Sequence, residues 1–140
     1  MMTDHGEMLS TLARADASRI KAFAETLIAP LGDITVHESR TGLVMLPMRG
    51  TAGGTAFHLG EVLVSEARIS LGEVTGYGMR RGRDLEAAMA MALIDMAVVT
   101  GVKSDACAAF CAHEAALQAK EDREILRRVD IDPLLIGIVS

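Results

Sequence analysis

Three arginines lie close together where a predicted strand runs into a predicted helix. Arg80, Arg81 and Arg83 follow the segment 76–79 and directly precede Asp84 in the sequence. The carboxylate of Asp84 suits the N-cap of the next helix. Guanidinium groups and helix N-termini both attract anions. The four residues therefore predict contact with an anion or an acidic partner. The alternative is a solvated strand end whose arginines pair with carboxylates of the chain itself.

A single carboxylate, Asp95, interrupts an otherwise apolar helical stretch from Ala87 to Val99. A buried carboxylate without a partner is costly, so Asp95 needs a hydrogen-bonding group. We expect it to be a structural residue or an interface residue rather than a catalyst.

Two cysteines and a histidine near the next helix raise the question of a metal site. Cys107 and Cys111 share a helix face, but His113 points about 200° away from Cys111. We therefore expect both cysteines to be small buried hydrophobic residues, and we expect no metal site.

The remaining candidate for chemistry is the glycine-rich run Gly50–Gly54. It lacks the Gly-Lys-Ser/Thr sequence of a phosphate-binding loop, and a strand rather than a helix follows, so it predicts a connection between two strands. No nucleophile–base pair can be read from spacing. We expect no catalytic residue and no cofactor.

The elements that position these residues run helices, then strands, then helices, which indicates one α+β domain over residues 1–140. Thr3 or Asp4 could cap a first helix and Asp16 a second, which ends near Pro30. Later helices are expected from Asp84 to the glycine at 101 and from residue 104 to the proline at 133.

The middle of the chain predicts an antiparallel sheet of about four strands, flanked by the N-terminal and C-terminal helices. Strands are expected over residues 34–38, 43–46, 63–71 and 74–80, with a turn at 39–42. Leu43–Leu46 is apolar on both faces and predicts a central strand. Ser65, Ala67 and Ile69 alternate with polar residues and predict one buried face.

Composition excludes several classes of protein. The chain has 140 residues, 50% hydrophobic, with 3% aromatic residues and a net charge of −5, which argues against a nucleic-acid binder. Its richest apolar stretch is 13 residues, against about 20 for a membrane span. The N-terminus has no apolar run of the kind that secretory signals carry. We expect a cytoplasmic protein that binds neither nucleic acid nor membranes.

The C-terminal residues are unusually apolar for a chain end, where order is otherwise weak. They include Leu134, Leu135, Ile136 and Ile138. The charged segment Lys120–Arg128 is expected to hold this tail away from the core. We therefore expect a subunit contact, with a homo-oligomer when the protein is alone; the alternative is a tail docked on its own domain.

Several spaced motifs match one known family in a single order without gaps across residues 38–97. They are Thr41–Met45, Arg49-Gly50, Gly53-Gly54, Phe57–Glu61, Gly76-Tyr77, Gly82–Asp84 and Ala92–Asp95. The chain resembles PhnG, the G subunit of the bacterial carbon–phosphorus lyase core complex of phosphonate catabolism.

The resemblance implies an accessory subunit that works with partner subunits, notably the I subunit. Together these subunits transfer the ribose triphosphate of ATP to methylphosphonate and release adenine. No stand-alone activity is implied for the G subunit. The alternative, from another class, is a divergent oligomeric scaffold or ligand-binding module outside that pathway.

The chain also departs from the family pattern. Family members tend to carry Thr-Arg in place of Ser65-Glu66, His-Ala-Glu in place of Ala87-Ala88-Met89, and a different C-terminal tail. Replacement of a basic residue by Glu66 matters for an anionic substrate or an altered partner surface.

Overall fold

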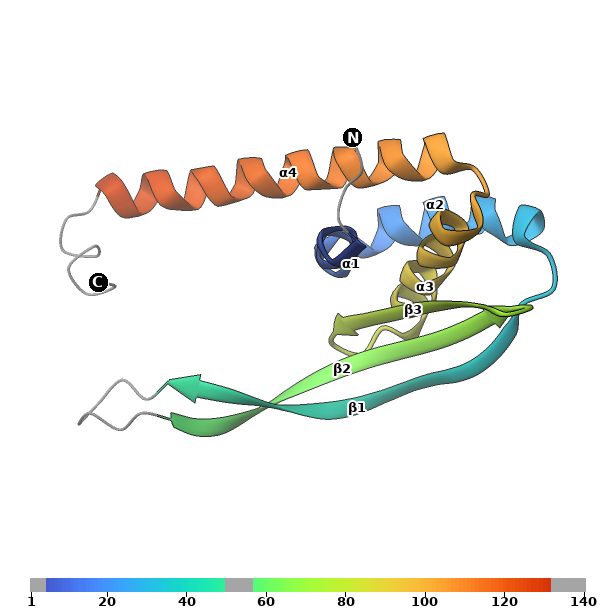
Figure 1. Ribbon diagram of the computed structural model, residues 1–140. Coiled ribbons are helices and arrows are strands. Elements are labelled where there is room, and N and C mark those ends of the chain that lie inside the picture. Colours follow the sequence, from blue (N-terminus) through green and yellow to red (C-terminus); the bar gives the residue numbers. More distant parts are fainter. Residues whose placement is uncertain (1–4, 50–56, 132–140) are drawn as a thin grey trace.

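The computed structural model describes residues 5–49 and 57–131, which form four helices and a three-stranded antiparallel sheet (Figure 1). The order is α1 (His5–Arg14), α2 (Ala17–Leu31), β1 (Thr35–Arg49), β2 (Phe57–Leu71), β3 (Val74–Arg81), α3 (Leu85–Thr100) and α4 (Ser104–Ile131). The α+β class is confirmed. The capping residues proposed for the first helix, Thr3 and Asp4, lie outside the described residues, as do the glycine-rich run 50–54 and the tail 132–140.

Local capping signals gave the correct boundaries for the two middle helices. The Asp16 carboxylate accepts a hydrogen bond from the Arg19 backbone N–H at 3.0 Å, and α2 ends at Gly32 with φ +86°. Asp84 caps α3 in the same way, and Gly101 ends it in the left-handed conformation that glycine adopts readily.

The sheet has the order β1-β2-β3, so within the described residues it contains three strands rather than the expected four. Residues 39–42 do not turn; they continue β1, and Ser39 and Gly42 lie opposite Ala67 and Val64 of β2. Because β2 is itself 15 residues long, it pairs with both predicted short strands at once. The irregularity is a bulge between Val36 and Glu38, which shifts the register without ending the strand.

The prediction that Leu43–Leu46 forms a central strand was also wrong. The segment around Leu43 belongs to β1, at the edge of the sheet, and the Leu43 side chain is 61% exposed. The central strand is β2, where the predicted alternation is confirmed: Ser65, Ala67 and Ile69 are fully buried. Apolar residues on both faces of a short segment did not distinguish a central strand from an uncovered edge.

The core lies between the sheet and α3, whose residues 87 to 97 are buried with the exception of the half-buried Met89. Helix α3 packs very closely on β3 at two glycines. A Cβ at Gly76 would lie 2.5 Å from the Ala92 carbonyl oxygen, and one at Gly78 would lie 2.9 Å from the Ala92 nitrogen. Glycine therefore allows the strand and the helix backbone to approach each other.

The long helix α4 packs against the body through its N-terminal half. Cys107 is fully buried, as predicted, and the ring of Phe110 stacks on Phe23 at 4.7 Å between ring centroids. From residue 119 to residue 127 every side chain is exposed, and this half extends beyond the body of the molecule (Figure 1). None of the helices in the described part of the chain is both long and apolar enough to cross a membrane.

Candidate functional site

The arginine cluster at the end of β3 is divided by the alternation of the strand. Gly76, Gly78 and Arg80 face the helices, whereas Tyr77 and Arg81 occupy the opposite face. The structure therefore does not gather Arg80, Arg81 and Arg83 into one site.

Arg80 is committed to α1. Its Nη1 donates to the Leu12 carbonyl, and its Nη2 donates to the Ala15 carbonyl at 2.7 Å. These carbonyls lie at the C-terminal end of α1, where a positive charge is favourable. Burial lowers the pKa of Arg80, and its buried Nε has no hydrogen-bond partner among the described residues. Arg80 thus joins β3 to α1.

Arg81 and Arg83 are exposed, and in the described part of the chain their side chains have no hydrogen-bond or ion-pair partner. The turn that carries them is fixed from below by Ser65, whose Oγ donates to the Gly82 carbonyl at 2.6 Å and accepts from the Asp84 N–H at 2.9 Å. The two free guanidinium groups therefore project from a well-anchored turn.

Asp84 is the fourth residue of the predicted cluster, and its carboxylate is already used twice. It accepts from the Ala87 N–H at 3.0 Å and pairs with the Lys21 ammonium group at 2.9 Å. The hydrogen bond from Lys21, followed by the bond from Ala87, lowers the pKa of Asp84. Asp84 connects α2 and α3.

Asp95 has the partners that its burial requires. It is 3% exposed, and its carboxylate oxygens lie 2.6 Å from His5 Nε2 and 2.9 Å from the Tyr77 backbone nitrogen. The expectation of a paired carboxylate is confirmed. Its role as an interface residue stays a prediction.

A second buried carboxylate, Glu114, was missed by the sequence analysis. It is 1% exposed and accepts two hydrogen bonds from the Arg19 guanidinium, at 2.8 and 3.0 Å, while His113 Nδ1 lies 3.5 Å away. Hydrogen bonding from Arg19 lowers the pKa of Glu114. Its spacing could have indicated that Glu114 is buried, because it lies seven residues after Cys107 and shares the same helix face.

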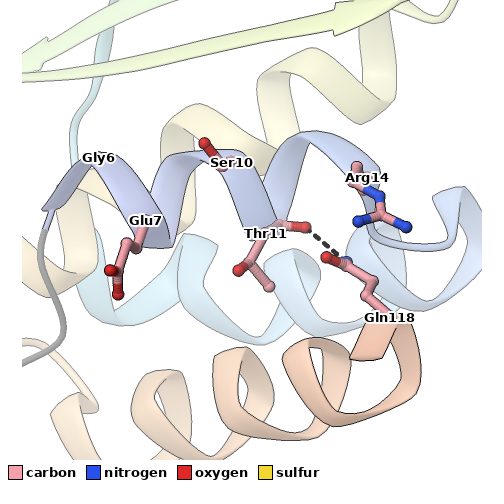
Figure 2. Close-up of a pocket in the computed structure, with 6 residues that line it drawn as sticks. All are labelled: Gly6, Glu7, Ser10, Thr11, Arg14 and Gln118. Carbon is pink, nitrogen blue, oxygen red and sulfur yellow. Dashed lines mark hydrogen bonds between the residues drawn. The ribbon is translucent and has the colours of Figure 1, made fainter. Parts of the chain in front are cut away.

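A shallow polar groove runs between α1 and α4 (Figure 2). It is lined by Gly6, Glu7, Ser10, Thr11, Arg14 and Gln118. Gln118 Nε2 donates to the Thr11 carbonyl at 2.9 Å, and Arg14 pairs with Asp122 at 3.1 Å. The residues that the two helices contribute to this groove are more than 100 positions apart in sequence, so local spacing could not reveal it. With carboxylates beside its single guanidinium, it has no marked preference for anions.

The face of the sheet that points away from the helices carries a network of charged residues. Arg40 pairs with Glu66 at 3.1 Å across β1 and β2, and Arg68 pairs with Glu38 at 3.1 Å. The Tyr77 hydroxyl donates to Glu66. The hydrogen bond from Tyr77, then that from Arg40, lowers the pKa of Glu66. Glu66, where the resemblance implies a departure from the family, therefore has partners on both neighbouring strands.

Ala87 and Met89, where the resemblance also implies a departure from the family, lie on α3. Ala87 is fully buried and supplies the N–H that Asp84 caps, and Met89 packs against the core. The cysteines are in apolar surroundings, where burial raises the pKa of Cys111 to about 11. Within the described residues, no group of three potential ligands could hold a metal ion.

Comparison with known proteins identifies the family. The model of the family described as "Phosphonate metabolism protein PhnG" matches residues 4–131. A relative from Stutzerimonas stutzeri, named "Putative C-P lyase subunit protein HtxH", is 31% identical over 108 residues, which cover 68% of this chain and 29% of the relative. The chain thus spans less than a third of that relative's length. Because the family model covers most of the chain, this protein belongs to the PhnG family of phosphonate metabolism proteins.

Proposed function

We propose that this chain is an accessory subunit of the carbon–phosphorus lyase system, active in the cytoplasm. It would assemble with partner subunits, notably the I subunit, which transfer the ribose triphosphate of ATP to methylphosphonate and release adenine. Membership of the PhnG family carries the proposal, and the name of the curated relative supports it.

The polar groups of the structure support an assembling role. Asp84 and Glu114 each hold two elements of the fold together, and Asp95 holds three. By contrast, Arg81 and Arg83 project freely from an anchored turn and are available to an acidic surface. The proposed chemistry therefore resides in the partner, and this chain supplies binding surfaces.

The direct test is adenine release from ATP in the presence of methylphosphonate. We expect none from this chain alone, slow or no transfer from the I subunit alone, and transfer when both are present. Robust adenine release by this chain alone, free of partner, contradicts the accessory role. Failure of the two chains to form a complex contradicts the proposed partner.

The apolar tail is proposed as a further subunit contact. It lies outside the described residues and includes Leu134, Leu135, Ile136 and Ile138. Burial of large aliphatic side chains contributes about 1.5–3 kcal/mol each. Light scattering over a concentration series, with the full chain and with residues 133–140 deleted, tests both this contact and self-association. A monomer at all concentrations, with unchanged I-subunit binding after the deletion, contradicts the contact.

A further inference from the structure

The two edges of the sheet differ in what covers them. At the β3 edge, the Tyr77 N–H donates to the Asp95 carboxylate of α3, so that backbone group is not available to another strand. Arg80 reaches from the same strand to α1. Helices α1, α2 and α4 also lie toward the β3 side in Figure 1. The β3 edge is therefore partly occupied by the chain itself.

The β1 edge is open. Within the described residues β2 is the only strand beside β1. In Figure 1, along the part of the sheet that includes β3, β1 lies on the side away from α1, α2 and α4. β1 is 15 residues long and exposes Val36, Leu43 and Met45 by 53%, 61% and 50%. A long exposed edge with apolar side chains is a template for pairing, which most folds avoid by shortening or covering the edge.

One half of β1 has little support within the chain. β3 pairs with β2 only as far as Val64, so residues 43–49 and 57–63 form a two-stranded ribbon that extends past β3 (Figure 1). A two-stranded ribbon is marginally stable in water, and a third strand stabilises it. A strand added at the β1 edge would supply that third strand.

We propose that an extended segment of the partner subunit binds beside β1 over residues 38–45 as a fourth strand of the sheet; this inference rests on the proposed function. Strand addition uses the free backbone groups of the edge, and the side chains of the edge strand then select the sequence that binds.

The side chains of β1 define the chemistry of that segment. Leu43 and Met45 lie on one face, so the partner strand needs apolar side chains there. On the other face, Arg40 is 66% exposed at its side chain, and Glu38 is 30% exposed. Arg40 already pairs with Glu66 and Glu38 with Arg68, and their exposed parts favour an acidic residue beside Arg40 and a basic residue beside Glu38 in the partner strand.

A second copy of this chain fits the edge less well. Antiparallel self-pairing that places Glu38 opposite Arg40 of the second copy is centred on Ser39. It ends where Thr35 meets Leu43 of the second copy, so Met45 remains uncovered. The bulge after Val36 would also fall inside the paired stretch. A partner strand avoids both difficulties.

The test uses this chain with and without the I subunit and measures hydrogen exchange segment by segment. We expect the outward-facing amides of residues 38–45 to exchange at least about tenfold more slowly in the complex than in the free chain. The exchange rates of residues 74–81 should change little. The L43K/M45K variant should weaken the complex about tenfold or more. The matched control I28K/V99K alters side chains of similar exposure, 52% and 55%, on α2 and α3, and should bind like the wild type.

The outcomes separate this inference from the proposed function. A complex in which residues 38–45 exchange as in the free chain overturns the inference and leaves the proposed function standing. If residues 38–45 exchange slowly in the chain alone, and more slowly at higher protein concentration, the edge binds a second copy. That result also overturns the inference. Absence of any complex overturns the proposed function and this inference together. Circular dichroism and urea unfolding of L43K/M45K establish that the variant is folded.

Discussion

The carboxylate of Asp95 binds the backbone N–H of Tyr77 at 2.9 Å, and this bond joins the buried helix α3 to the outer edge of β3. The same carboxylate lies 2.6 Å from the imidazole of His5, at the start of α1. One side chain therefore holds three elements that are separated by up to 90 residues in sequence. It also takes up one backbone N–H of the β3 edge, and β1 forms the other edge of the sheet.

Replacement of Asp95 by alanine should destabilise the fold. The Tyr77 N–H and the His5 imidazole both lose their acceptor, and an unsatisfied buried group costs about 1–3 kcal/mol. We expect urea unfolding of Asp95→Ala to show a loss of that size. Asp33→Ala, which removes an exposed carboxylate, should unfold like the wild type. Equal stability of the two variants would contradict the role assigned to Asp95.

Replacement of Gly78 by alanine should be at least as damaging. The added Cβ would lie 2.9 Å from the Ala92 nitrogen and closer still to the Ala88 carbonyl oxygen, so α3 would have to move away from β3. Overpacking of this kind costs about 1–3 kcal/mol, and more where backbone must shift. Gly42→Ala is the control because its Cβ would meet nothing within 4 Å. Thermal unfolding of the two variants measures the difference.

Tyr77 is the single tyrosine of the chain, so its ionisation can be followed by tyrosinate absorbance. Burial, and then the hydrogen bond to Glu66, raises the pKa of Tyr77 to about 12. The contribution of Tyr77 to stability is therefore fully present below about pH 10 and is lost as the pH rises through about 12.

The folded protein should titrate near pH 12, and the urea-unfolded chain near 10. In Glu66→Gln the midpoint should fall but remain above 10, because burial is the larger cause. Circular dichroism monitors the fold during the titration. A folded wild type whose tyrosine ionises near pH 10 would show that the Tyr77–Glu66 bond does not form.

The features that the sequence predicted correctly depend on local chemistry. Asp16 and Asp84 cap helices through backbone groups three residues away, and the alternation around Ala67 follows from the pleat of a strand. The turn expected at 39–42 failed for the complementary reason. Its residues are compatible with a turn, but pairing with the long strand β2 keeps them extended.

For the candidate site, too, local chemistry could be predicted from the sequence, whereas contacts between distant segments could not. The need of Asp95 for a partner was predictable because an apolar helix surrounds it, but its partners, His5 and the Tyr77 N–H, are brought there by the fold. The Arg19–Glu114 pair was missed because charges on helices are usually solvated, and the packing of α4 against the other helices buries Glu114. The alternation along β3 could have separated Arg80 from Arg81 in advance.

Glu114 should make stability depend on acid pH. Hydrogen bonding from Arg19 holds the pKa of Glu114 below its ordinary value of 4.5, so the folded state binds this proton less readily than the unfolded chain. Its contribution is therefore fully present above about pH 4.5 and is lost as the pH falls through the lowered pKa.

We expect Glu114→Gln to be less stable than the wild type by about 1.5 kcal/mol or more at pH 7. The difference in unfolding free energy should shrink below about pH 4.5, where the wild-type carboxylate becomes protonated. Glu73→Gln, at an exposed position in the β2–β3 turn, provides the control. A difference that stays constant down to pH 3 would show that Arg19 does not stabilise the charged form of Glu114.

The three neighbouring arginines should separate into one that holds the fold and two that bind a partner. Arg80→Ala removes the donors to the Leu12 and Ala15 carbonyls, so its unfolding free energy should fall by about 1–3 kcal/mol. The double variant R81A/R83A removes two exposed side chains and should change stability by less than about 0.5 kcal/mol.

In complex formation the R81A/R83A variant, rather than Arg80→Ala, should show the larger effect. Charge-assisted contacts contribute about 1.5–3 kcal/mol each when they are desolvated, so R81A/R83A should bind the I subunit at least about tenfold more weakly. R123A/R127A makes the same change in net charge at exposed positions of α4 and distinguishes a local contact from general electrostatic attraction. Titration of each folded variant against the I subunit gives the comparison. Equal affinity of R81A/R83A and the wild type would remove these two arginines from the interface, because their exposed side chains would then have neither an internal nor an external partner.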